Sequence, residues 1–301
     1  MPTKCGIILH KRLTMKIITT IAEVSECVRA ARQRGQRIGL VPTMGALHAG
    51  HGSLIERAVR ECGFVVVSIF VNPTQFGPKE DLASYPRPFE QDAAYCEKLG
   101  ADVIFAPTPE EMYPQPQQTW VEVQKLTDGL CGAMRPGHFR GVTTVCAKLF
   151  NITSPNTAYF GQKDAQQAIV IKRMVADLNM PLEICVCPIV REPDGLAMSS
   201  RNRYLTPPQR QQALCLSGAL QLCCREVASG GRDVRTLIEQ MQQLIEKAGG
   251  RVDYIQIVDT ETLEPISLLR PGAMAALAVF VGSTRLIDNC VLDLNTPQKG
   301  V

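Results

Sequence analysis

The sequence has no apolar run as long as the roughly 18–20 residues of a membrane-spanning helix, so no membrane partner is expected. Its net charge of +3 at pH 7 is too small to indicate nucleic acid as a partner. None of its twelve cysteines lies in a C-x-x-C pair, so the spacing of a zinc site is missing. We expect a globular protein located in the cytoplasm. Its cysteines are expected to be small buried thiols in a reducing compartment.

The first 14 residues differ from the rest of the chain. Basic residues stand on both sides of a very short apolar patch at residues 6–9, and no small-residue cleavage site is clear. A signal peptide is therefore not indicated. We expect residues 1–14 to be a disordered extension and the folded chain to begin near Met15.

Residues 15–192 alternate short apolar runs with segments of helical periodicity. In one such segment the apolar side chains stand at positions 54, 55, 58, 59 and 62, which is helix spacing, and a β-branched run typical of a strand follows. The alternation predicts a Rossmann-like α/β domain, with a parallel sheet and helices on both faces. We expect strands from Ile17 and over residues 38–41, 64–71, 101–106, 158–160 and 182–190, and helices over residues 21–34, 53–62, 90–99, 141–152 and 165–178.

The pattern changes in the last third of the chain. Two long helical stretches, residues 207–228 and 234–248, precede three strand-like segments at residues 252–258, 273–281 and 284–292. Gly282 and Ser283 form a predicted hairpin turn between the last two segments. Residues 193–301 are therefore predicted to form a smaller C-terminal α+β domain, which begins with an M-S-S-R-N loop.

Two of the four histidines lie in one glycine-rich turn, residues 41–51, between a predicted strand and a predicted helix. Gly45 and Gly50 allow backbone to approach a ligand closely, and free N–H groups at a helix start attract phosphate. His48 and His51 are spaced so that both can face the same phosphates. The alternative is two unrelated surface histidines. H-x-G-H resembles the HIGH-type signature of nucleotidylyltransferases and class I aminoacyl-tRNA synthetases, which implies attack on an α-phosphate with release of pyrophosphate.

Two further turns carry groups suited to a nucleotide. Lys163 is a point charge suited to phosphate, and Asp164 can cap a helix or reach ribose hydroxyls. Ser199, Ser200 and Arg201 lie in a loop that can wrap a triphosphate, and their position resembles the KMSKS-type loop that partners H-x-G-H in the same superfamily. A purely structural cap and a solvated basic turn are the respective alternatives.

Polar residues also follow the predicted strand at residues 64–71. The amide of Gln75 can bind a hydroxyl and a carboxylate together, whereas the alternative for this segment is an ordinary Asn-Pro turn. Residues 135–142 can form another anion-facing helix start or a plain loop with a capping role.

Together these motifs resemble the pantothenate synthetase family. They are P-T-M-G-A-L-H-x-G-H, N-P-T-Q-F, Y-P-R, P-G-H-F-R-G-V, G-x-K-D-x-Q-Q and R-E-x-D-G-L-A-M-S-S-R-N, in this order between Met15 and Tyr204. The resemblance implies an ATP-dependent ligase that activates pantoate as an acyl-adenylate and passes it to β-alanine. It also implies a homodimer, and Mg²⁺ carried mainly by the phosphates of ATP, with Asp92 as a candidate carboxylate near the metal.

The resemblance further implies roles for residues at matching positions. His51 would donate a proton with His48 beside it, and Lys163 and Arg201 would meet the phosphate charge. Gln75 and Gln167 would hold pantoate, with Gln75 also near β-alanine. The ATP site would be formed by Met44, Gly45, Ala46, Leu47, His48, Ala49, Gly50, His51, Gly161, Gln162, Lys163, Asp164, Val190, Met198, Ser199, Ser200 and Arg201.

Two positions depart from the family pattern. Gly52 stands where a larger apolar residue, often leucine, is usual, and glycine in a helix costs up to ~1 kcal/mol relative to alanine. Ala165 replaces a common aromatic residue. The rival interpretations are another adenylate-forming enzyme on the same scaffold, which the paired glutamines disfavour, and a non-catalytic nucleotide-binding protein, which the histidines and Lys163 disfavour.

Overall fold

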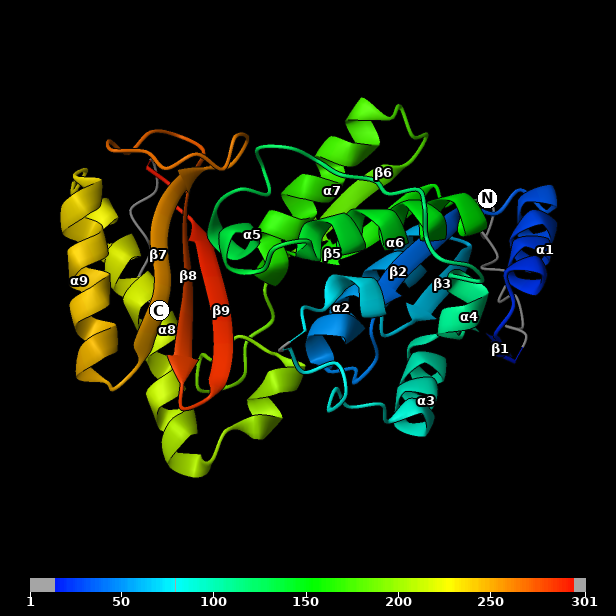
Figure 1. Ribbon diagram of the computed structural model, residues 1–301, viewed down its shortest axis with the longest axis horizontal. Helices are drawn as coiled ribbons and strands as arrows, with labels where there is room; N and C mark the ends of the chain where they lie inside the picture. The colour runs from blue at the N-terminus through cyan, green and yellow to red at the C-terminus, as the bar shows by residue number, and fades with distance from the viewer. Residues whose placement is uncertain (1–13, 79, 295–301) are drawn as a thin grey trace, which may run out of the picture.

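The computed structural model describes residues 14–78 and 80–294 (Figure 1). A six-stranded sheet has the order β1-β4-β3-β2-β5-β6 with every pairing parallel, and a three-stranded antiparallel sheet has the order β7-β8-β9. The fold therefore confirms the predicted Rossmann-like sheet with an α+β unit after it. The strands of the large sheet are β1 (Lys16–Ile18), β2 (Ile38–Thr43), β3 (Phe64–Ile69), β4 (Val103–Phe105), β5 (Thr157–Gly161) and β6 (Glu183–Cys187).

Helices cover both faces of the large sheet because its central strands are apolar on both sides. Side chains that alternate along the strands, such as Leu40 against Val41, belong to different clusters of buried residues. The cluster around Leu40 includes α1, α6 and α7, and the cluster around Val41 includes α2 and α3. The helices are α1 (Ile21–Gln33), α2 (Ala49–Glu61), α3 (Phe89–Leu99), α4 (Pro109–Met112), α5 (Leu130–Met134), α6 (His138–Thr153) and α7 (Ala165–Asp177).

The small sheet lies between two long helices and the Rossmann-like unit (Figure 1). One of its faces packs against α8 (Pro207–Ala228) and α9 (Val234–Lys247), and Met274 and Ala276 on the other face join the core of the large sheet. Burial on both faces explains why the central strand reads as an unbroken apolar run. The strands are β7 (Arg251–Asp259), β8 (Ala273–Val281) and β9 (Thr284–Val291).

Some element boundaries differ from the sequence prediction. The second helix begins at Ala49 rather than residue 53, α6 begins at His138 rather than residue 141, and β6 ends at Cys187 rather than residue 190. The prediction also missed α4, α5 and three short 3-10 helices, since so few residues show no periodicity. These are η1 (Pro73–Gln75), η2 (Gln162–Asp164) and η3 (Ser200–Tyr204).

The predicted domain boundary at residues 192 and 193 stays a prediction. The predicted extension, apart from residue 14, lies outside the described residues. Within the described parts of the chain, no helix is both long and apolar enough to cross a membrane.

Candidate active site

A cavity of about 220 Å³ lies beyond the carboxyl ends of β2, β3 and β5. The predicted turn at residues 44–51 and the predicted turn at residues 198–201 both line it, so they meet around one space as the sequence predicts. The predicted site residues that line the cavity are Met44, His48, Gly50, His51, Gln75, Gly161, Lys163, Asp164, Gln167, Val190, Met198, Ser199, Ser200 and Arg201.

The cavity continues into a cleft of about 850 Å³ between the large sheet and the small sheet. Arg135, His138 and Lys163 line both spaces, so the cavity and the cleft adjoin. Six predicted residues are not among those that line the cavity: Gly45, Ala46, Leu47, Ala49, Gln162 and Asp92.

The two histidines of the first turn cap helix α2. His48 is the N-cap residue, and its Nδ1 accepts a hydrogen bond from the backbone N–H of Gly50 at 3.1 Å. Nδ1 of His51 accepts from the backbone N–H of His48 at 3.3 Å, and the two ring centroids are 4.1 Å apart. Because each Nδ1 is an acceptor, each neutral ring carries its proton on Nε2. This cap explains why α2 begins at Ala49, earlier than predicted. It also excludes the alternative interpretation that His48 and His51 are two unrelated surface residues.

Both rings are held in the neutral form. Burial, with the nearby charge of Lys163, lowers the pKa of His48 to about 4. Burial, with His48 as the next cause, lowers the pKa of His51 to about 3. Near neutral pH these groups therefore donate hydrogen bonds from Nε2 without carrying a positive charge.

Asp92, from helix α3, shapes the backbone of the first turn. Its two carboxylate oxygens accept from the backbone N–H groups of Ala46 and Leu47, each at 2.7 Å. Gly45 is required beside it, because its φ is +83° and a Cβ would stand 3.0 Å from the Asp92 carboxylate. Asp92 thus acts on the predicted ATP turn through the backbone, and the expectation that it lies near the metal stays a prediction.

Two cationic side chains reach the cavity from turns far apart in the sequence. Nζ of Lys163 lies 3.5 Å from Oδ2 of Asp164, which makes no side-chain cap to helix α7. Burial alone would raise the pKa of Asp164, but the charges of Lys163 and Arg201 hold it below its usual value. Arg201 is paired with Asp81, with Nε–Oδ2 and Nη2–Oδ1 distances of 3.2 and 3.0 Å.

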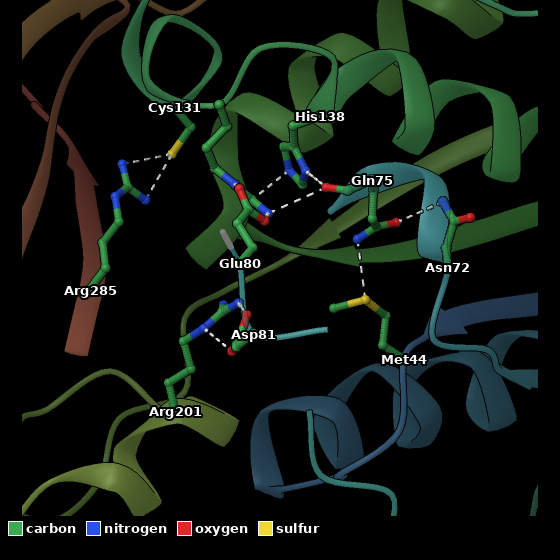
Figure 2. A network of polar contacts seen from close by, with 10 residues as sticks. Met44, Asn72, Gln75, Glu80, Asp81, Cys131, His138, Arg201 and Arg285 are labelled. Carbon is green, nitrogen blue, oxygen red and sulfur yellow. Dashed lines mark hydrogen bonds and ion pairs between the residues drawn. The ribbon is translucent and has the colours of Figure 1, made fainter. Parts of the chain in front are cut away.

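In the turn that follows β3, the side-chain amide of Gln75 is held by two neighbouring side chains (Figure 2). Oε1 of Gln75 accepts from Nδ2 of Asn72 at 3.1 Å, and its Nε2 contacts Sδ of Met44 at 3.2 Å. Asn72 also caps η1, so the turn that was the alternative interpretation is present as well. Gly141 of α6 packs so closely on this turn that a Cβ would collide with the carbonyl of Thr74.

His138, which lies beside Gln75 in Figure 2, belongs to a partly buried network that includes Arg135. Nδ1 of His138 lies 2.8 Å from the carbonyl oxygen of Gln75, to which it donates, so its Nε2 accepts from Nη1 of Arg135 at 2.9 Å. Burial, followed by the charge of Arg135, lowers the pKa of His138 to about 4. Nε of Arg135 donates to Glu80 at 2.8 Å, so its charge is balanced by a carboxylate. The segment predicted at residues 135–142 thus forms part of the cavity wall through Arg135 and His138.

The sequence prediction missed Glu80 and Asp81. Both lie just after the Asn-Pro turn and pair with arginines on other turns, Arg135 and Arg201. Two adjacent acidic residues near a predicted anion site are a signal in the sequence, because carboxylates there can pair with the cationic side chains of that site.

Of the two departures from the family pattern, Gly52 has a local explanation and Ala165 has none. A Cβ at Gly52 would collide with the hydroxyl of Tyr95 from α3, so tyrosine fills the space of a larger side chain there. Ala165 is buried at the start of α7 and lines the larger cleft.

A magnesium ion would have few protein ligands at this site. No group of three or more metal-binding side chains occurs among residues 14–78 and 80–294. The two oxygens of Asp92 already accept backbone hydrogen bonds, which leaves Asp164 as the carboxylate on the cavity wall. The residues therefore fit an ion held mainly by substrate phosphates.

Comparison with known proteins shows which family the chain is similar to. Residues 16–291 match the family described as pantoate-β-alanine ligase. The chain is 55% identical to the pantothenate synthetase of Moorella thermoacetica over 282 residues, which are 93% of this chain and 100% of that protein. A pantothenate synthetase structure from Thermus thermophilus matches with a TM-score of 0.87 and 46% identity, over 92% of this chain and 99% of that one. A pantoate-β-alanine ligase from Francisella tularensis, solved with β-γ ATP and β-alanine, matches with a TM-score of 0.79 and 37% identity, over 92% and 97% of the two chains.

Proposed function

The chain belongs to the pantoate-β-alanine ligase family, and we propose that it condenses pantoate with β-alanine to form pantothenate, using ATP. The reaction passes through pantoyl-adenylate and releases AMP and pyrophosphate. The observation that carries the proposal is the meeting of the 44–51 and 198–201 turns on one cavity that also contains Lys163 and the amides of Gln75 and Gln167.

In the first step a carboxylate oxygen of pantoate attacks the α-phosphorus of ATP. Gln75 and Gln167 hold the pantoate, and its position sets the in-line geometry. Negative charge moves onto the leaving pyrophosphate, where Lys163 and Arg201 supply positive charge and Nε2–H of His51 and His48 donates hydrogen bonds. Neutral His51 therefore acts through this Nε2–H hydrogen bond, and a full proton transfer from the ring would first require its imidazolium form.

In the second step the free amine of β-alanine attacks the acyl carbon, and AMP leaves. Activation is needed because the oxygen of a free carboxylate is a very poor leaving group. No protein nucleophile takes part, so the cysteines have no role in this chemistry. Gln75 is proposed to lie near the amine as well as near pantoate.

Three accompanying features belong to the same proposal. A bound Mg²⁺ would neutralise phosphate charge during the transfer. The resemblance to the family supports a homodimer. The described cysteines, all free thiols, support a reducing compartment, and we propose the cytoplasm.

The proposal is tested by pantoate-dependent exchange of radiolabelled pyrophosphate into ATP, in the presence of Mg²⁺ and without β-alanine. We expect exchange with pantoate and little or none with competing hydroxy acids. Folded protein that gives no exchange would exclude the two-step scheme, and exchange with another acid alone would indicate a different adenylate-forming ligase.

A further inference from the structure

Two cysteines of the C-terminal unit lie in contact outside the proposed active site. Cys224 comes from helix α8 and Cys290 from strand β9, which pack against each other. Their Sγ atoms are 3.5 Å apart, although the residues are 66 positions apart in the sequence. A disulfide has an S–S distance of about 2.05 Å, so the two sulfurs need to approach by roughly 1.5 Å to bond.

The surroundings of the pair differ from those of the neighbouring buried thiols. Cys224 and Cys290 are both partly exposed at the margin of the C-terminal core, whereas Cys223, next in the chain, is 1% exposed. The pair therefore lies closer to the surface than Cys223, which is covered by packing. This difference makes Cys223 a matched control.

The charges near the pair favour a thiolate on one of the two sulfurs. The hydrogen bond with Cys290, together with the charges of Arg191 and Arg225, lowers the pKa of Cys224 to about 7. The same hydrogen bond raises the pKa of Cys290. A thiolate is the nucleophile in thiol–disulfide exchange, so Cys224 is the attacking group and Cys290 the resolving group.

We propose that Cys224 and Cys290 are a modification site, at which a small-molecule disulfide such as oxidised glutathione converts the two thiols reversibly to an intramolecular disulfide. In the first step the Cys224 thiolate attacks one sulfur of oxidised glutathione, which gives a mixed disulfide and one glutathione thiolate. Cys290 then loses its proton, and its thiolate attacks Sγ of Cys224 and releases the second glutathione thiolate. Two electrons pass from the cysteine pair to the glutathione disulfide.

The site lies beside a contact between the small sheet and the predicted ATP turn. Asn289 precedes Cys290, and its Nδ2 donates to the carbonyl oxygens of Gln162 and Lys163 at 3.0 and 2.9 Å. The disulfide would tie α8 to the strand that carries this contact. The proposal itself concerns thiol chemistry, so it stands or falls independently of the ligase activity.

The test is a redox titration of the whole protein in buffers of reduced and oxidised glutathione. After acid quenching and alkylation of free thiols, tryptic peptides are identified by mass spectrometry. We expect a disulfide-linked pair of peptides, residues 211–225 and 286–299, that grows from undetectable to the main species as the buffer becomes oxidising. Dithiothreitol should restore both free peptides.

Single substitutions identify the sulfur atoms, because the first peptide contains three cysteines. Cys224→Ser and Cys290→Ser should abolish the linked pair, and Cys223→Ala should keep it. The proposal is overturned if the wild-type pair stays reduced under conditions that add glutathione to Cys27 or Cys185, which are also partly exposed. It is equally overturned if the link persists in Cys224→Ser.

Discussion

The ring of His51 accepts a hydrogen bond from the backbone N–H of His48, the residue that caps the same helix. One contact therefore fixes the helix start, the tautomer of His51 and the direction of its Nε2–H. The two imidazoles are structural and chemical groups at once, and substitutions have to be interpreted with both roles in view.

Acid pH is expected to destabilise the fold through these rings. Their pKa values of about 4 and 3 lie below the ordinary value of 6.5. Between pH 6.5 and about 4 the unfolded chain binds protons that the folded chain does not. The free energy of unfolding therefore decreases as the pH is lowered through this window, by at most about 1.4 kcal/mol per pH unit for each ring. Above pH 6.5 the two rings make no such contribution.

Urea unfolding at pH 7.5 and pH 5 measures this effect in the wild type and in His51→Gln. The variant should lose less stability than the wild type between the two pH values. An equal or larger loss in the variant would contradict a ring that is neutral in the folded state.

His51→Ala and Lys163→Ala are expected to slow adenylate formation by at least about a hundredfold, because each removes a donor to the leaving pyrophosphate. His51→Ala should also cost about 1 kcal/mol of stability, since the backbone N–H of His48 loses its acceptor. Pyrophosphate exchange and urea unfolding measure the two effects. Lys172→Ala, an exposed lysine of α7 that does not line the cavity, is the control and should keep the wild-type exchange rate.

Asp81→Asn is expected to lower the KM for ATP by up to about fivefold. Arg201 has to exchange its carboxylate partner for phosphate, and a partly exposed ion pair contributes up to about 1 kcal/mol. Initial rates at varied ATP measure the change, and Glu80→Gln is the comparison because Glu80 pairs with Arg135 instead. A raised KM in Asp81→Asn would show that the pair orients Arg201 for ATP.

The substitution Asp92→Asn distinguishes whether Asp92 supports the backbone of the 44–51 turn or binds the metal ion. Asparagine has one acceptor oxygen, so one of the N–H groups of Ala46 and Leu47 loses its partner, at a cost of about 1–3 kcal/mol to the turn. We expect a higher KM for ATP and an unchanged Mg²⁺ concentration at half-maximal rate. A shift in that Mg²⁺ concentration would instead indicate a metal ligand.

Gly52→Leu is expected to destabilise the fold by about 1–3 kcal/mol, because the added side chain meets the Tyr95 hydroxyl. Tyr95→Ala opens the space, so the double variant should be more stable than Gly52→Leu alone. Urea unfolding of the two single variants and the double variant gives the coupling energy. Additive effects would mean that Tyr95 does not fill the position.

The sequence predicted elements well where the physical signal is local. The limits of β8 follow from an apolar run that ends at Gly282, and those of α8 from its proline start and the glycines after it. The start of α2 was wrong because imidazole is an unusual cap, and its acceptor role is decided by the tautomer rather than by residue type.

The site was predictable as a set of turns and not as a network. Parallel strands bring their carboxyl ends to one edge, so the meeting of the turns follows from the fold class. The pairing of Asp81 with Arg201 spans 120 positions and that of Glu80 with Arg135 spans 55, and no local pattern specifies either. The roles of the individual site residues remain predictions for the experiments above.

On the side that α8 and α9 leave open, the small sheet carries apolar side chains, among them Met274 and Ala276, that pack against the Rossmann-like unit. A fragment of residues 193–301 produced alone would expose this surface to water and would be prone to aggregate. The two sheets therefore depend on a shared core, and we expect the C-terminal sheet to be stable only when the Rossmann-like unit is present.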